Sequence, residues 1–138
     1  MPNILDLAFL NLPRNTYLVR QERVKREGSR YYTWTPGVIA TTALEAIYIP
    51  DQFPDSRKYQ PLDWLEIMNN EAANDLTLTM NGNETLPVPH GSIRTVRNKP
   101  LWHVQVTNNG GVNTTAGLII ITLRKEPLTI DQWARKQS

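Results

Sequence analysis

Residues 75–82, "DLTLTMNG", constrain the fold more than any other part of the sequence. Leu76, Leu78 and Met80 alternate with two threonines, and a period of two places successive side chains on opposite faces of a strand. Asn81 and Gly82 follow, and both residue types tolerate the positive φ angles of a tight hairpin turn. The segment therefore predicts a half-buried strand that ends in a β-hairpin.

Further short segments with turn residues between them also predict strands. β-Branched and aromatic residues are concentrated in "SIRTVRN", "LWHVQVT", "GLIIITLRK" and, broken at Pro36-Gly37, "YYTWTPGVIATTALEAIYIP". Pro87 and Pro89 cannot donate to a central ladder, so "ETLPVP" is predicted to be an edge strand or an irregular crossing. The apolar run 118–121 predicts a strand covered on both faces. Residues 51–61 are predicted to be a surface connection.

These segments fit one β domain with an appendage at each end. A length of 138 residues suits a single domain of common size. We predict an N-terminal arm over 1–15, an antiparallel β-sandwich over 16–125 that includes a strand at 16–24, and a C-terminal tail or short helix over 126–138. The arm is apolar, and the tail has one prominent apolar residue, Trp133.

Composition argues against several classes of function. The chain has no cysteine, which excludes disulfides and thiol chemistry, and its 2 histidines lack the spacing of metal motifs. A net charge of +2 argues only weakly for an acidic partner. Asp6 and Pro13 interrupt the N-terminal apolar run, so we expect no secretion signal and no membrane span. We expect no metal and no cofactor.

The two histidines are the natural candidates for a catalytic base. His90 lies in the turn "PVPHGS", where exposure to solvent is expected. In "LWHVQVT", alternation predicts that Trp102, Val104 and Val106 face the core and that His103 lies on the opposite face. No nucleophile, base and acid fall into an evident constellation, so we expect no enzyme and no catalytic residues.

The most charged segment, "RQERVKREGSRYYTW", contains basic residues next to Tyr31, Tyr32 and Trp34. Basic residues interleaved with aromatics can follow a phosphate backbone and stack on bases. Because the net charge is small, we favour a solvated hairpin whose aromatic rings enter the core. A single-strand nucleic-acid binder remains an alternative, as does a docking surface for an acidic protein.

A weak internal similarity links two parts of the chain. Asn69-Asn70 and Asn108-Asn109 each follow a predicted strand and precede another. Turns draw on few residue types, so chance accounts for such a likeness more readily than duplication does. The pattern nevertheless favours paired hairpins in one sandwich.

The segment 63–125 resembles small β-sandwich structural proteins of tailed-phage virions. The resemblance depends on a series of motifs in order: "LTLTMNG", a "VP.G..R" crossing at residues 88–94, Trp102, "TNNG" and "TAG". It covers a little under half of the chain, and the N-terminal half matches no pattern of that group. The position within a virion (shell, vertex, collar or tail) is therefore left open.

The resemblance implies a jelly-roll-like sandwich that works as a structural subunit. We expect a homo-oligomer that contacts other virion proteins, made in the host cytoplasm and located in the virion, with no membrane and with nucleic acid not favoured as a partner. A receptor- or glycan-binding module is a further alternative. The residues expected to make subunit contacts are apolar in the arm and tail and basic after the arm: Leu5, Leu7, Phe9, Leu10, Leu12, Trp133, Arg20, Arg23 and Arg26.

Overall fold

The strands of this protein pair in a nested order, from the outermost two inward. The computed structural model describes residues 27–127, and within them the first strand pairs with the eighth, the second with the seventh, the third with the sixth and the fourth with the fifth. These strands are β1 (Tyr32–Trp34), β2 (Leu44–Tyr48), β3 (Leu62–Asn69), β4 (Leu76–Met80), β5 (Glu84–Val88), β6 (Ile93–Leu101), β7 (His103–Asn108) and β8 (Ile119–Arg124).

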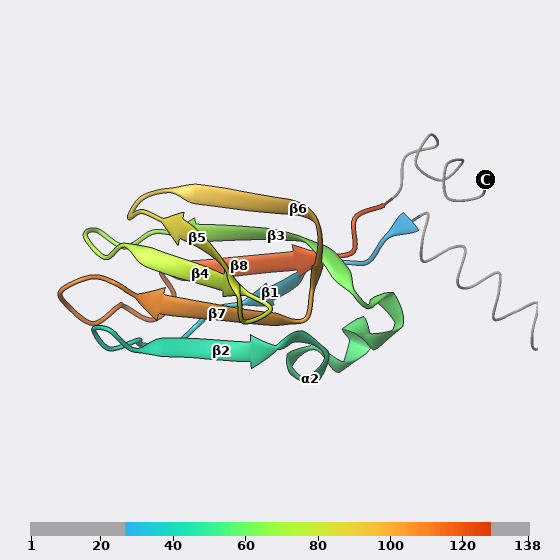
Figure 1. The fold of residues 1–138 in the computed structure, drawn as a ribbon, viewed down its shortest axis with the longest axis horizontal. Helices are drawn as coiled ribbons and strands as arrows, with labels where there is room; N and C mark the ends of the chain where they lie inside the picture. Colours follow the sequence, from blue (N-terminus) through green and yellow to red (C-terminus); the bar gives the residue numbers. More distant parts are fainter. Residues whose placement is uncertain (1–26, 128–138) are drawn as a thin grey trace, which may run out of the picture. The chain divides into compact units, whose positions relative to one another are not determined.

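The strands form two antiparallel sheets with a common core (Figure 1). One sheet has the order β1-β8-β3-β6, and the other has the order β2-β7-β4-β5. Buried side chains of both sheets, such as Ile67 and Ile121 from the first and Leu78 and Val106 from the second, belong to one hydrophobic cluster. The predicted all-β antiparallel sandwich is confirmed for the described residues.

Alternation decides which side chains enter this core. Leu76, Leu78 and Met80 are buried as predicted, and Thr77 and Thr79 face outward. Full burial of each large apolar side chain contributes roughly 1.5–3 kcal/mol, so such positions fix the register of their strands.

The last strand alternates as well. Ile119, Ile121 and Leu123 are buried, whereas Ile120 is partly exposed. One face of β8 therefore packs in the core. Cover of its other face by the arm or by another subunit would involve parts outside residues 27–127 and stays a prediction.

The turn between β4 and β5 follows the sequence closely. Asn81 and Gly82 have φ angles of 54° and 80°, in the left-handed region. The loop also includes Asn83, since Met80 pairs with Glu84, so it is one residue longer than a two-residue turn. Strand β5, with Pro87, lies at the edge of its sheet as predicted.

The connection from β2 to β3 has more structure than predicted. It contains the short helix α2 (Ile49–Gln52) and the 3-10 helix η1 (Pro54–Tyr59). Proline occupies an early position in each, where a missing N–H costs nothing. Most residues of 51–61 are exposed, as expected of a surface connection, whereas Ser56 is buried and Phe53 and Tyr59 pack in part against the core.

The chain enters and leaves the sandwich at one point. The compact body comprises Ser29 to Glu126, and near its ends the Ser29 amide donates to the Lys125 carbonyl at 2.9 Å. The Lys125 amide donates in return to the Ser29 hydroxyl at 2.7 Å. This is the end of the body that carries α2 and η1 (Figure 1). The arm at 1–15, the strand at 16–24 and the tail beyond Pro127 lie outside the described residues.

Candidate functional site

The aromatic residues of the charged segment at 20–34 are divided between core and surface. Tyr32 and Trp34 are 1% and 6% exposed, so neither ring can stack on a base. Tyr31 is 55% exposed, but its ring packs edge-on against Trp64 and beneath the guanidinium of Arg124. Two of the three aromatic rings therefore enter the core as predicted and Tyr31 does not, while residues 20–26 of the segment lie outside the described residues.

The buried Tyr32 takes part in a small polar cluster at the surface. Its hydroxyl donates to Asp55 at 3.1 Å, and the Arg30 guanidinium lies over its ring at 4.4 Å. Burial, with the hydrogen bond to Asp55, raises the pKa of Tyr32 to about 12. The same hydrogen bond, together with the one from Arg30, lowers the pKa of Asp55. This cluster attaches η1 to β1 and has the character of a structural contact.

The other predicted site residues cannot be compared with the structure. Every residue assigned to subunit contacts lies outside residues 27–127: Leu5, Leu7, Phe9, Leu10, Leu12, Arg20, Arg23, Arg26 and Trp133. Their roles remain predictions from the sequence.

His90 is exposed, as predicted, and forms a pair with Asp75. One oxygen of Asp75 accepts from the His90 amide at 3.0 Å and lies 2.8 Å from the imidazole Nδ1. The His90 amide, then its side chain, lowers the pKa of Asp75. The hydroxyl of the nearby Ser92 donates to the Pro89 carbonyl instead of to His90. The pair therefore holds the β5–β6 turn against the β3–β4 loop and does not complete a hydrolytic triad.

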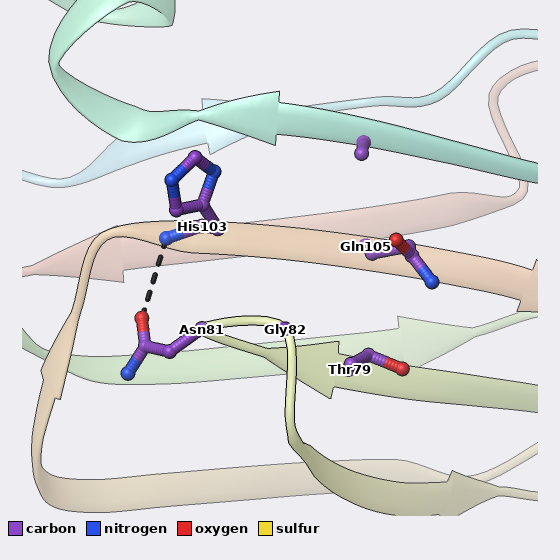
Figure 2. Close-up of a pocket in the computed structure, with 6 residues that line it drawn as sticks. Thr79, Asn81, Gly82, His103 and Gln105 are labelled. Atoms are coloured by element: carbon purple, nitrogen blue, oxygen red, sulfur yellow. Dashed lines mark hydrogen bonds between the residues drawn. The ribbon is translucent and has the colours of Figure 1, made fainter.

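A hollow opens on the outer face of the β2-β7-β4-β5 sheet (Figure 2). It has a volume of about 360 Å³ and is lined by Ala46, Thr79, Asn81, Gly82, His103 and Gln105. Three of these residues form one row across the sheet, because Ala46 and Thr79 are the register partners of Gln105 on either side. The small side chain of Ala46 and the absent one of Gly82 leave space beside the longer Gln105.

Asn81 fixes one end of this hollow through its side chain. The side-chain oxygen accepts from the Trp102 amide at 2.8 Å. It also accepts from the His103 amide at 3.3 Å, the bond drawn in Figure 2. The side-chain nitrogen donates to the Pro100 carbonyl at 2.7 Å. The hairpin turn between β4 and β5 is thus bonded to the corner where the chain passes from β6 to β7.

This corner overturns the predicted position of Trp102. Strand β6 ends at Leu101 and β7 begins at His103, so alternation does not continue through Trp102. Leu101 and Val104 are buried, whereas Trp102 is 38% exposed. The prediction that Trp102 faces the core is wrong, because the chain changes sheets at this residue. The prediction that His103 lies on the face opposite Val104 is confirmed.

Polar groups around the hollow are open to a ligand. Among the described residues, no hydrogen bond engages the side chains of Thr79 and Gln105, and the ring of His103 meets only that of Tyr48. The two rings lie 4.7 Å apart between centroids, and of the two residues His103 lines the hollow. The strands here are rigid elements, so these groups are held in fixed relative positions.

Alternation along each strand predicts the direction of the polar side chains that line this hollow. Thr79, His103 and Gln105 occupy outward positions of strands whose side chains alternate between the two faces, but they meet only through the register between β4 and β7.

Within residues 27–127, no group of three or more His, Asp or Glu side chains gathers closely enough to bind a metal ion. No helix of the described part has the length and apolar character of a membrane span.

Comparison with known proteins assigns no family to the chain. The sequence matches no protein-family model and no curated protein.

Proposed function

We propose that this protein is a structural subunit of a tailed-phage virion, with a jelly-roll sandwich as its body. Nested pairing of eight strands across two four-stranded sheets is the arrangement expected of a double-sheet jelly roll. That architecture occurs in viral capsid proteins as well as in lectins and cupins, so topology alone does not choose among them.

The observation that carries the structural role is the meeting of Ser29 and Lys125. The Ser29 amide donates to the Lys125 carbonyl, and the Lys125 amide donates to the Ser29 hydroxyl. These two hydrogen bonds hold the two ends of the body together. Asp63 reinforces the exit, because it accepts from the Glu126 amide at 2.7 Å and lies 3.5 Å from the Lys125 ammonium. Two flanking segments that start from one fixed point suit a rigid body joined to its neighbours through extensions.

The flanking segments supply the contacts in this proposal. The N-terminal arm has an apolar character that favours docking on another subunit, from Leu5, Leu7, Phe9, Leu10 and Leu12. In the C-terminal tail, Trp133 has the same role. Arg20, Arg23 and Arg26 provide polar contacts. Copies joined head to tail in this way form rings or lattices, in which each body contributes one unit of a shell or tail.

Removal of the arm tests this role. The full chain and a variant lacking residues 1–12 are compared by light scattering at equal concentration. The proposal predicts that the full chain forms a multi-subunit species and that the variant is lighter while it keeps its β-sheet circular dichroism. An unchanged mass for the variant would count against the arm as the contact.

The rival single-strand nucleic-acid binder finds little support in the described surface. Tyr32 and Trp34 are buried in the core, and Arg30 forms an ion pair with Asp55 at 3.4 Å. Arg57 and Lys58 of η1 are likewise paired, with Asp51 and Asp55 respectively. A phosphate backbone would have to compete with these carboxylates for each cation.

A further inference from the structure

We propose that the hollow beside Gln105 binds a neutral saccharide. This site goes beyond the structural role above and does not depend on it. The proposal starts from the hydrogen-bonding groups of Thr79 and Gln105, which lie side by side on β4 and β7 and which no described residue engages (Figure 2). A hydroxyl and a carboxamide each donate and accept, which matches the hydroxyls of a sugar.

The lack of charged side chains on this face disfavours phosphate and carboxylate ligands. The outward positions of its strands carry no Asp, Glu, Lys or Arg: Leu44, Ala46, Tyr48, Thr77, Thr79, Thr85, Pro87, His103, Gln105 and Thr107. A phosphate or carboxylate ligand would find no fixed cation there. The outer face of the other sheet is different, since its outward positions include Glu66, Arg97 and Arg124.

A partly exposed aromatic side chain packs on one of the residues that line the hollow. Tyr48 is 39% exposed and packs on His103, which lines the hollow. The apolar C–H face of a pyranose packs on an aromatic ring, while its hydroxyls form hydrogen bonds around the edge. Such a mixed surface suits a saccharide better than it suits a purely apolar ligand.

Size and openness set the expected affinity. A volume of about 360 Å³ is near the lower end of the ~300–1,000 Å³ of small-ligand sites. An open hollow leaves one side of the ligand in water, so we expect a dissociation constant of about 1 mM for one site. Several copies in one assembly would raise the apparent affinity for a polymeric glycan through multivalency.

Two measurements on the full chain test the site. The labelled protein is applied to an array of neutral and acidic oligosaccharides, and any neutral hit is titrated as the free oligosaccharide while the Gln105 side-chain amide is followed by NMR. We expect binding to neutral hexose or N-acetylhexosamine chains, with shifts in that amide. Free and glycoconjugate forms of the same oligosaccharide then distinguish a polysaccharide from a protein-linked glycan as the source.

Three variants assign the binding to the hollow. Gln105→Ala removes the central hydrogen-bonding group, and Ala46→Tyr fills the space with a residue that suits a strand. Both should lower saccharide affinity at least about 10-fold, the effect of losing about 1.4 kcal/mol. The matched control Thr95→Ala, on the outer face of β6, should bind as the unmodified chain does. Circular dichroism confirms that each variant folds.

Each of the remaining outcomes overturns the site. These are absence of binding to every neutral saccharide, binding to acidic chains alone, or binding by Gln105→Ala and Ala46→Tyr that is as tight as that of the unmodified chain. A lower assembly mass for these variants without saccharide binding would instead assign the face to contact between copies. Because the structural role is tested by removal of residues 1–12, the two proposals can fail independently.

Discussion

Asn69 and Asn108 make the same set of hydrogen bonds at equivalent points of the two sheets. Each is the last residue of its strand, β3 or β7, and each is 0% exposed. Each side-chain oxygen accepts from the amide two residues later, that of Glu71 or of Gly110. Each side-chain nitrogen donates to two backbone carbonyls, those of Asn74 and Val88 or those of Ile39 and Val112.

This pair gives a physical meaning to the weak internal similarity of the sequence. Loops that close one end of a sandwich bury backbone carbonyls, and a buried carbonyl without a donor is costly. An asparagine at the strand end supplies the two donors and also accepts the first amide of the turn. The repeated "NN" therefore reflects the same solution at two strand ends, whether or not the hairpins share an ancestor.

Replacement of Asn108 by alanine should strongly destabilise the sandwich. The Val112 carbonyl would lose this donor, the Ile39 carbonyl would keep only the Thr114 amide, and the Gly110 amide would lose its acceptor. Together these losses cost about 2–4 kcal/mol of unfolding free energy. Urea denaturation measures the loss. Asn70 provides the control, because it follows Asn69 in the sequence and its side chain is exposed. Asn70→Ala should change the free energy of unfolding by less than about 0.5 kcal/mol. Equal effects of the two substitutions would contradict the account.

Two adjacent glycines should differ sharply in tolerance of alanine. A Cβ at Gly110 would overlap the side-chain oxygen of Asn74 and lie 2.8 Å from its Cα, whereas one at Gly111 would meet no atom within 4 Å. Gly110→Ala should therefore cost about 1–3 kcal/mol by overpacking. Gly111→Ala should be close to neutral. Thermal unfolding of the two variants compares them, and similar midpoints would show that the loop adapts freely.

Stability should fall in alkali because of Tyr32. Its pKa is about 12 in the folded protein and about 10 in an unfolded chain, so folding favours the protonated phenol. That contribution is complete below about pH 10 and disappears as the pH rises through about 12. The decline in unfolding free energy over this range should be shallower in Tyr32→Phe. Denaturation in urea at a series of pH values measures both slopes, and parallel slopes would contradict the burial argument.

Asn81 should stabilise the corner between β6 and β7. Asn81→Gly keeps the φ angle of 54° accessible but removes the bonds to Pro100, Trp102 and His103. We expect a loss of about 1–2 kcal/mol and faster hydrogen exchange of the Trp102 amide. Asn83→Ala, in the same turn but with an exposed side chain, serves as the control. Unchanged protection of that amide in Asn81→Gly would refute this role.

The parts of the fold that sequence predicts are those that depend on local pattern. Alternation placed Leu76, Leu78 and Met80 in the core, and the Asn81-Gly82 pair placed the hairpin. These signals work because side-chain direction in a strand and positive φ at a turn are properties of a few neighbouring residues.

The parts that sequence did not predict depend on contacts between distant segments. Alternation predicts that Trp102 faces the core, which is wrong because the chain passes between the two sheets at this residue. The hollow was missed because Ala46 and Thr79 meet Gln105 only through strand registers. Register is set by the whole core and cannot be obtained from a single strand.

The mass of the native complex tests the central claim most directly. The chain has a mass of 15.8 kDa, and native mass spectrometry or sedimentation reports how many copies associate. A structural subunit should form a defined multiple of that mass, which returns to smaller species when residues 1–12 are removed. A stable monomer of the full chain at every concentration measured would contradict the proposed role.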